Sequence, residues 1–230
     1  MTPDISIIIP AYNEEKYLRQ TLHSLKNQTF QNFETIMVTN GCTDKTEELV
    51  KKKVSERFRH LSLPKANVSV ARNAGALNAN GKILVFLDAD TQLEQDGLQK
   101  IKAQFTPKYA VASTKSKPDT LELRYKIALW LKNICQNSFL YHGCSGVLIC
   151  RKEDFQKVGG YNPEIIVREN RKLILKLEKI GKFKCIDTTV TTSTRRFQQW
   201  GLSKIFFFWV CQWVKDKWGD IRLSDYEKVR

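Results

Sequence analysis

The sequence lacks several features that would indicate particular protein classes. Its six cysteines include no C-x-x-C pair, which argues against a zinc site or a redox motif. The apolar run at 205–211 falls short of the roughly 20 apolar residues that a helix needs to cross a bilayer. There is no internal repeat and no low-complexity tract. Because the N-terminus shows no basic segment followed by a cleavage site, we expect a cytoplasmic protein with free thiols.

The composition is that of a folded protein with a large excess of positive charge. Apolar residues make up 42% and charged residues 27% of the chain, which excludes wholesale disorder. The formal net charge of +14 indicates an anionic partner: a nucleic acid, a phosphorylated ligand or an acidic membrane surface. Since no nucleic-acid recognition motif and no interleaving of basic and aromatic residues is found, we expect no nucleic-acid partner.

The first half of the chain alternates apolar strands with helices. Strands are predicted at 5–9, 33–38, 59–63 and 83–87, and helices at about 14–28, from 43 onward, and at 69–79. This rhythm predicts a parallel sheet with helices on both faces. Polar segments follow three of the strands, at 10–14, 39–44 and 88–92. Because ligands bind beyond the carboxyl ends of such strands, we expect these segments to share one crevice.

Asp88-Ala89-Asp90 ends the last of these strands. Residues i and i+2 of an extended chain point the same way, so both carboxylates can face one ligand. Two adjacent carboxylates repel each other unless a positive group lies between them. A divalent ion such as Mg²⁺ or Mn²⁺ fits this pair, because it takes one or two carboxylates together with phosphate oxygens. The alternative is a solvated turn after the strand, where Asp is common.

The second half of the chain is less regular. Strands are predicted at 109–115, 147–150 and 189–193, helices at 121–135 and 168–180, and a glycine-containing turn at 159–163. No clear linker separates the two halves. We therefore predict one continuous domain.

Six short strings together resemble the family 2 glycosyltransferases of the GT-A fold. They occur in the family's order: IIIPAYNEE at 7–15, VTNGCTDKT at 38–46, SVARNAG at 69–75, FLDADTQL at 86–93, VGGYNP at 158–163 and REN at 168–170. The string TTSTRRF at 191–197 resembles a tail found in one bacterial and archaeal subgroup. The resemblance implies a Rossmann-like, mostly parallel sheet in a single domain at 1–200. A nucleotide-binding half at about 1–92, an acceptor half at about 93–200 and a C-terminal helical segment at 201–230 are expected.

By resemblance, the ends of the first strands wrap a nucleotide. The residues assigned to it are Pro10, Ala11, Tyr12, Asn13, Glu14, Asn40, Gly41, Arg72, Asp88, Ala89 and Asp90. A helix that opens after the first strand would offer free N–H groups and its dipole to a phosphate. Thr39-Asn40 stands where the family often has Asp-Asp. Because an amide offers a different donor set from a carboxylate, the sequence does not indicate which nucleotide base is recognised. For Arg72 the alternative is a solvated arginine on a helix face.

The resemblance also implies a metal site. Asp88 and Asp90 would bind Mn²⁺ or Mg²⁺, and Gln92 is a further candidate ligand because a residue at this place binds the ion in the related polyprenyl-phosphate mannosyltransferases. The ion would neutralise the departing nucleoside diphosphate as the bond to the anomeric carbon breaks. The expected donor is a nucleoside-diphosphate sugar of the UDP or GDP type.

Inversion at that carbon requires a base on the acceptor's side. The family commonly uses the Asp of a Glu-Asp pair at a helix start, whereas this chain has Glu169-Asn170. Because asparagine accepts no proton at neutral pH, we assign the catalytic role to Glu169. The alternatives are a phosphate acceptor that needs no base, a loss of activity, or a Glu169 that only stabilises the helix N-terminus.

Three further residues are assigned to the diphosphate or the acceptor. Arg195 and Arg196 suit bidentate phosphate contacts, and their alternative is a charge pair on the surface. His142 lies where the family's acceptor loop runs, although a lone histidine is more often structural.

The C-terminal segment is apolar on every side from 205 to 211, which a solvated surface helix does not tolerate. Core packing, a subunit interface and shallow insertion at a membrane surface remain as explanations. Its tryptophans and the flanking Lys204 and Lys215 suit an interfacial helix, and the net charge would hold it to anionic lipid. Peripheral contact with the inner face of the membrane is therefore one expectation.

Together these features predict an inverting, metal-dependent transferase. It would move a sugar from a nucleoside-diphosphate sugar to an acceptor hydroxyl or a lipid phosphate, on a lipid-linked or glycan acceptor. The alternative is a non-catalytic nucleotide-sugar-binding or membrane-associated scaffold protein of the same fold, suggested by Asn40 and Asn170. A sugar nucleotidyltransferase is disfavoured because its Gly-rich basic loop after the first strand is absent.

Overall fold

The computed structural model describes all residues except 1, 139–140, 145, 219–220 and 225–230. The strands are β1 (Ile5–Ala11), β2 (Phe33–Asn40), β3 (Phe58–Leu63), β4 (Ile83–Leu87), β5 (Thr91–Leu93), β6 (Tyr109–Pro118), β7 (Asn137–Ser138), β8 (Tyr141–His142), β9 (Val147–Arg151) and β10 (Lys182–Thr192). The helices are α1 (Leu18–Lys26), α2 (Thr46–Lys51), α3 (Val68–Leu77), α4 (Gly97–Gln104), α5 (Leu123–Gln136), α6 (Lys152–Lys157), α7 (Glu169–Leu177), α8 (Arg195–Trp218) and a 3-10 turn at Ile221–Leu223. The end of the predicted segment 201–230 therefore lies outside the described residues.

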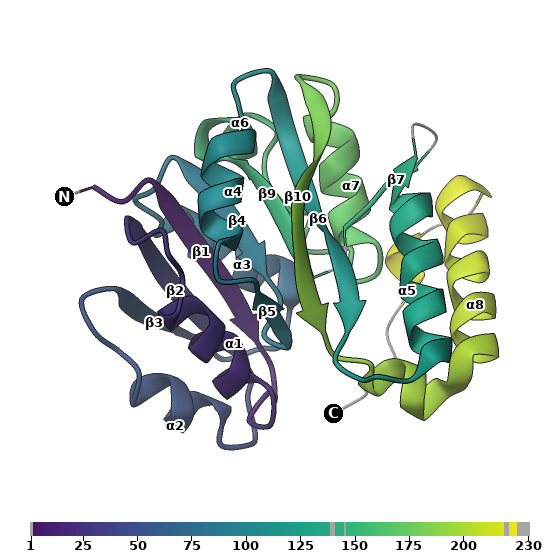
Figure 1. Ribbon diagram of the computed structural model, residues 1–230, viewed down its shortest axis with the longest axis horizontal. Helices are drawn as coiled ribbons and strands as arrows, with labels where there is room; N and C mark the ends of the chain where they lie inside the picture. Colours follow the sequence, from purple (N-terminus) through teal and green to yellow (C-terminus); the bar gives the residue numbers. More distant parts are fainter. Residues whose placement is uncertain (1, 139–140, 145, 219–220, 225–230) are drawn as a thin grey trace.

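Eight strands form one sheet in the order β3-β2-β1-β4-β9-β6-β10-β5 (Figure 1). β3, β2, β1 and β4 run parallel, β9 is antiparallel to β4 and β6, and β10 is parallel to β6. β5 returns antiparallel to β10 at the edge. The predicted Rossmann-like sheet is confirmed, with β9 and β5 as the antiparallel strands.

Helices cover both faces of the sheet, which explains the apolar strands. Ile7 and Ile9 of β1 pack in a core with Leu18 of α1, whereas Ile8 packs in a second core with Ala71 of α3. Successive side chains of a strand point to opposite faces, so a strand covered on both sides must be apolar throughout. Every residue of β1, β2 and β4 is buried accordingly.

Two helix boundaries in the first half differ from the sequence prediction. Asn13 adopts a left-handed conformation with φ of 54°, so α1 begins only at Leu18 rather than near residue 14. Helix α2 begins at Thr46 rather than at 43 and ends at Lys51, with Val50 buried and Val54, beyond its end, exposed. Turns thus separate the strand ends from the helices that follow them.

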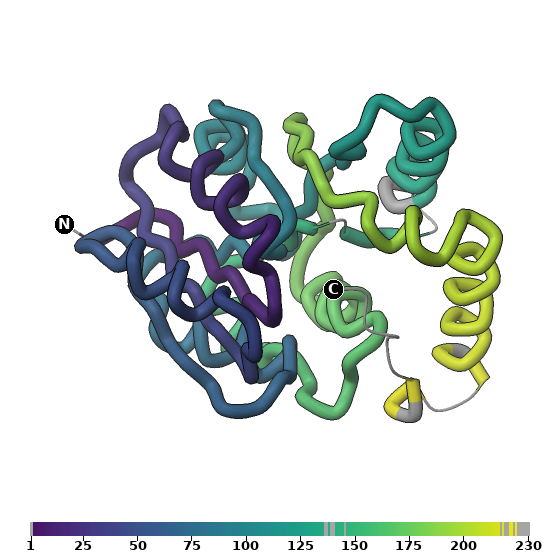
Figure 2. Tube along the Cα trace, turned by 90° about the horizontal axis from the view of Figure 1, so that it is seen from below, coloured from purple at the N-terminus to yellow at the C-terminus, as the bar shows by residue number. Residues whose placement is uncertain are grey.

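The C-terminal helix begins near the end of β1 and then runs to the opposite end of the molecule. α8 kinks at Gly201, whose φ of 73° and ψ of 160° belong to a region that essentially only glycine adopts. Figures 1 and 2 place α8 at the same end of the molecule as α5, and the two helices meet where the rings of Tyr125 and Phe197 are 6.0 Å apart. No helix in the described part of the chain is long and apolar enough to span a bilayer.

Candidate active site

The carboxyl ends of β2, β1 and β4 lie side by side and bring the three predicted polar segments together. Asn13 Nδ2 donates to Thr43 Oγ1 at 3.0 Å, and Thr43 N donates to Asn13 Oδ1 at 2.8 Å. These two bonds join the loop after β1 to the loop after β2. Pro10 and Ala11 end the buried strand itself, and Tyr12 is half-buried at the start of the loop.

Asn40, predicted to contact the nucleotide, is buried and binds the backbone with both polar atoms. Its Nδ2 donates to Ala11 O at 2.8 Å, and its Oδ1 accepts from Asn67 N at 3.0 Å. Gly41 follows with φ of 67°, and a Cβ there would lie 2.7 Å from Ala66 N. Asn40 therefore joins β1 to the segment that precedes α3.

Asp88 is linked to Glu169 through a buried arginine. Arg72 of α3, only 3% exposed, places Nη2 2.8 Å from Asp88 Oδ1 and Nη1 2.7 Å from Glu169 Oε1. Its guanidinium lies 5.2 Å from the centroid of the Tyr161 ring. Burial disfavours the charge, but Tyr161 and the two carboxylates outweigh it and raise the pKa of Arg72. Arg72 is therefore not the solvated arginine of the alternative interpretation.

Asp90 meets a second arginine that comes from the other end of the chain. Arg195 Nη2 lies 3.0 Å from Asp90 Oδ2, and the same guanidinium binds both carboxylate oxygens of Glu14 at 2.7 Å. Burial raises the pKa of Asp90 to about 6; Asp88 and Glu14 add to this effect, and Arg195 opposes it. The raised pKa thus reflects mainly the cost of placing a charged carboxylate away from water, which a bound cation would offset.

Ala89 separates the two aspartates and faces the core. It is buried beneath α1, where Thr21 Oγ1 donates to its carbonyl at 2.8 Å. In the described part of the chain, no group of three or more His, Cys, Asp or Glu side chains could hold a metal ion. A divalent ion at Asp88 and Asp90 must draw further ligands from a bound phosphate, as Mg²⁺ and Mn²⁺ readily do. The oxygen donors of Asp88 and Asp90, and the burial that disfavours an uncompensated charge on Asp90, fit such an ion.

Gln92 is not brought to the aspartates by the structure. It lies in edge strand β5, and its Nε2 donates to Gln20 Oε1 of α1 at 3.0 Å. Its assignment as a metal ligand stays a prediction that this geometry does not support.

Glu169 begins α7 with one carboxylate oxygen occupied. Its Oε1 accepts from Arg72 and, at 3.1 Å, from Asn170 Nδ2, while its Oε2 accepts no hydrogen bond from the described residues. Asn170 Oδ1 in turn accepts from the Tyr161 hydroxyl at 2.8 Å. An ionised aspartate in place of Asn170 could not donate to Glu169, so the amide found here holds the Glu169 side chain in position. The role of Tyr161 was not recognised from the sequence, although it lies within the VGGYNP string.

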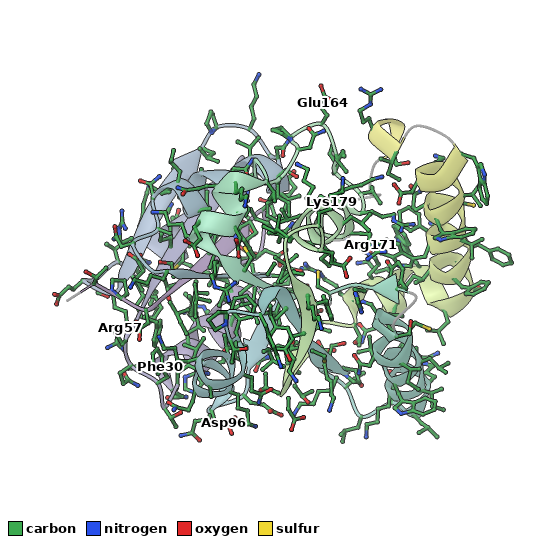
Figure 3. The ribbon with its side chains drawn as sticks, turned by 90° about the horizontal axis from the view of Figure 1, so that it is seen from above. Phe30, Arg57, Asp96, Glu164, Arg171 and Lys179 are labelled. Carbon is green, nitrogen blue, oxygen red and sulfur yellow. The ribbon has the colours of Figure 1, made fainter. Side chains whose placement is uncertain are left out.

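His142 lies away from the aspartates. Its Nδ1 pairs with Glu178, and its ring stacks on Phe183 with centroids 4.2 Å apart. Arg171, labelled in Figure 3, donates to the His142 carbonyl at 2.6 Å. Glu178 follows the end of α7, roughly 13 Å along the helix from Glu169. A structural role for His142 fits these contacts, and its predicted role at the diphosphate or the acceptor has no support in them.

The remaining two basic residues at the site lie on α8 and α5. Arg196 follows Arg195 and lies 5.6 Å from the centroid of the Trp200 ring. Lys132, in the inward-facing part of α5, was missed because no motif contains it. Its position in the helix could have indicated it. Lys132 lies three residues after buried Leu129 and seven after buried Tyr125, where a helix that faces the core usually has an apolar residue.

Three curated relatives show the similarity in sequence. Glycosyltransferase GlyA of Streptococcus pneumoniae is 36% identical over 99 residues, which cover 42% of this chain and 14% of that protein. An uncharacterized glycosyltransferase of Haemophilus influenzae is 39% identical over 101 residues, 43% of this chain and 40% of that protein. Chondroitin synthase of Pasteurella multocida is 27% identical over 191 residues, 79% of this chain and 20% of the synthase. The chain spans less than half the length of each relative.

Solved structures share the fold, and a family model matches most of the chain. TarS 1–349 of S. aureus, in complex with UDP, has a TM-score of 0.65 at 21% identity over 85% of this chain and 62% of that chain. Mannosyltransferase PcManGT from Pyrobaculum calidifontis, in complex with GDP-Man and Mn²⁺, has a TM-score of 0.67 at 19% identity over 83% of this chain and 57% of that chain. The model of glycosyl transferase family 2 matches residues 6–197. With the sheet and the strand-end residues described above, this shows that the chain belongs to glycosyl transferase family 2 and has the GT-A fold.

Proposed function

We propose that this chain transfers a sugar from a nucleoside-diphosphate sugar to an acceptor hydroxyl or lipid phosphate, with inversion at the anomeric carbon. The observation that carries the proposal is the bridge from the partly exposed Asp88 through buried Arg72 to buried Glu169. It couples a carboxylate suited to the ion of the donor to a carboxylate suited to the acceptor. Complexes of the structural neighbours with UDP and with GDP-Man and Mn²⁺ support a donor of the UDP or GDP type.

On the donor side, Asp88 and Asp90 would hold Mn²⁺ or Mg²⁺ against the diphosphate. When bound, the ion supplies positive charge that stabilises the departing nucleoside diphosphate. Arg195, already 3.0 Å from Asp90, is placed to contact the same phosphates, and Arg196 is its neighbour. The segment from Pro10 to Glu14, at the end of β1 and in the loop after it, would form the nucleotide's side of this site.

On the acceptor side, Glu169 would take the proton through Oε2. Its other oxygen is bound by Arg72 and Asn170, which keep the carboxylate in one orientation. A base must lie within hydrogen-bond reach of the proton that it removes, and orientation by a partner group improves that geometry. This proposal assigns the role of the family's usual aspartate to the neighbouring glutamate.

The test is release of nucleoside diphosphate by purified protein with Mn²⁺ and a panel of UDP-, GDP- and dTDP-sugars. We expect Asp90→Ala to lower metal-dependent turnover by at least about a hundredfold, since a charge that stabilises the leaving group is worth that much. Asp96→Ala is the matched control, because the side chain of Asp96 (Figure 3) is 49% exposed and pairs with Lys100 at 2.9 Å. Full turnover by Asp90→Ala would refute the metal assignment.

The scaffold alternative has its own structural support and its own outcome. Asn40 uses both polar atoms on the backbone, and Glu169 has one oxygen occupied, so neither is fully available to a ligand. If wild-type protein binds one donor as tightly with as without Mn²⁺ and turns over none across a broad acceptor panel, the non-catalytic interpretation is correct.

Peripheral membrane contact through α8 is the second part of the proposal. The helix exposes Phe206 and Phe207 at 65% each and Trp218 at 74%, and neighbouring α5 exposes Trp130 at 61%. The sequences of the two helices contain three and five basic residues and a single acid, Asp216. Aromatic side chains beside basic ones suit the interface of an anionic leaflet, here the inner face of the membrane.

Vesicle flotation tests this contact. We expect binding to vesicles that contain phosphatidylglycerol, weaker binding to pure phosphatidylcholine, and loss of binding in Phe206→Ser/Phe207→Ser. The control Val54→Ser removes an exposed apolar side chain elsewhere on the surface. Equal binding of the double variant and the wild type would rule out α8 as the contact, and self-association without lipid binding would indicate a subunit interface.

A further inference from the structure

Lys132 lies on the side of α5 that faces the protein. It continues the stripe of Tyr125 and Leu129, which are 3% and 1% exposed, and is itself half-buried. The next residue, Asn133, fixes the helix at this point: its Nδ2 donates to Ser116 O at 2.8 Å and its Oδ1 accepts from Ser116 N at 3.0 Å. The base of the Lys132 side chain is therefore held against the end of β6.

The ammonium of Lys132 has charged neighbours but no direct partner. No carboxylate of the described residues lies within ion-pair distance of its Nζ, and no hydrogen bond to it is formed among them. Burial lowers the pKa of Lys132, and nearby Asp88 and Asp90 oppose that effect. A half-buried ammonium that lies near two carboxylates but pairs with neither keeps its donors available to a further anion.

Lys132 approaches the aspartates from the side opposite to the nucleotide loops. The strand order places β2 and β1 on one side of β4, and β9 and β6 on the other. Tyr12, Asn13 and Glu14 follow β1, whereas Lys132 belongs to the helix that packs on β6. A ligand whose nucleoside lies over β1 and β2 and whose diphosphate lies at Asp88 and Asp90 therefore presents its distal phosphate toward Lys132.

We infer that Lys132 binds the β-phosphate of the donor from the acceptor half and stabilises it as the leaving group. This inference rests on the proposed function. When the bond between the anomeric carbon and the β-phosphate oxygen breaks, the electron pair stays on that oxygen, the sugar carbon bonds to the acceptor oxygen, and the acceptor proton passes to Glu169. Lys132 supplies positive charge to the newly formed anion from the acceptor half, in addition to Arg195 and the ion.

Calorimetric binding of UDP, GDP, UMP and GMP in Mn²⁺ tests the inference. Lys132→Met removes the charge and keeps the apolar stem that packs in α5, and Lys132→Arg keeps the charge. We expect Lys132→Met to weaken binding of the preferred nucleoside diphosphate about tenfold or more and to leave the monophosphate unchanged, since a charge-assisted contact to one phosphate is lost. Lys132→Arg should retain most of the affinity. Lys126→Ala, an exposed lysine on the same helix, is the control with no change.

Two results overturn the inference. One is diphosphate binding by Lys132→Met that equals the wild type, and the other is an equal loss for diphosphate and monophosphate, which indicates a general structural effect. Asp90→Ala, measured in parallel, separates this failure from that of the proposed function. If Asp90→Ala loses metal-dependent binding while Lys132→Met does not, only the role of Lys132 is wrong. If the wild type binds neither UDP nor GDP, the proposed function is wrong as well.

Discussion

The N-terminal sheet buries its apolar side chains, whereas the C-terminal helix exposes many of them. In β1, Ile8 is fully buried between a neighbouring strand and α3, whereas Phe207 of α8 is 65% exposed. Figure 2 shows these two regions at opposite ends of the molecule. The comparison shows that the sheet has a complete apolar core from this chain alone. The C-terminal helix, in contrast, has an apolar surface that the described residues leave uncovered, as expected for a region that meets a partner.

The candidate active site lies between these two regions and draws on both. Asp88 and Asp90 belong to the buried sheet, while Arg195 begins the C-terminal helix and Lys132 comes from its neighbour α5. The charged groups are fixed on the sheet side by buried bonds. The charged groups of Lys132 and Arg195 lie instead on α5 and α8, whose apolar side chains are partly exposed.

The largest effect on stability should come from truncating the two apolar side chains compared above. Ile8→Ala removes packing from a filled core and should lower the free energy of unfolding by about 2–5 kcal/mol. Phe207→Ala removes an exposed ring and should change it by no more than about 0.5 kcal/mol. Urea unfolding of both variants in the absence of lipid measures the difference. A large loss in Phe207→Ala would mean that the ring is covered in solution, and the contrast between the two regions would fail.

Arg72→Ala should have the next largest effect, because it leaves two carboxylates near the core without their counter-ion. We expect a loss of about 3 kcal/mol in the free energy of unfolding, since Glu169 is buried and would keep an unpaired charge. Arg57→Ala is the control: Arg57 (Figure 3) is half-buried and lies over the Phe33 ring at 4.9 Å without bridging two carboxylates, and its loss should cost less than about 1 kcal/mol. Equal losses in the two variants would show that the Asp88–Arg72–Glu169 bridge adds nothing specific.

The smallest effect concerns pH and separates two buried carboxylates. Because burial raises the pKa of Asp90 to about 6, the folded protein binds a proton that the unfolded chain does not bind between roughly pH 6 and 4. The contribution of Asp90 to the free energy of unfolding therefore grows as the pH falls through about 6, by about 1 kcal/mol between pH 7 and pH 5. The free energy of unfolding is measured without metal by urea unfolding at several pH values. The value for the wild type minus the value for Asp90→Asn isolates this contribution.

Glu34 provides the control of opposite sign. Burial opposes its charge, but bonds from Asn80, Ser6 and Arg59 outweigh burial and lower its pKa. Its stabilising contribution is therefore present above the ordinary pKa of a glutamate and is lost as the pH falls through the lowered value. The free energy of unfolding of the wild type minus that of Glu34→Gln should therefore decrease toward low pH. If the differences for Asp90→Asn and Glu34→Gln changed in the same direction with pH, burial would not raise the pKa of Asp90.

Local patterns predicted the strands well and some helix boundaries poorly. The apolar run at 83–87 coincides with β4, and the carboxylates of Asp88 and Asp90 follow it as the i, i+2 geometry requires. The start of α1 was placed too early because the left-handed Asn13 depends on its bonds to Thr43, thirty residues away in the sequence. A boundary that a distant residue sets gives no signal in the local pattern.

Two assigned residues show the same limit at the site. Gln92 continues the alternation after Asp90, yet its amide binds Gln20 of α1. His142 lies in a suggestive string, yet its ring is held by Glu178 and Phe183. In both cases the side chain contacts a residue of another element, and only the packing of the elements decides which residue is within reach.

The sequence by itself determined the sheet, the order of its motifs and the pair of carboxylates after β4, because burial and strand geometry act over a few neighbouring residues. The tertiary structure alone decided which charges meet. Arg72 reaches Glu169 across 97 residues of sequence, and Arg195 reaches Glu14 across 181. A buried charge is stable only beside an opposite charge, whatever its distance along the chain, so these pairs exist only once the sheet has brought the strand ends together.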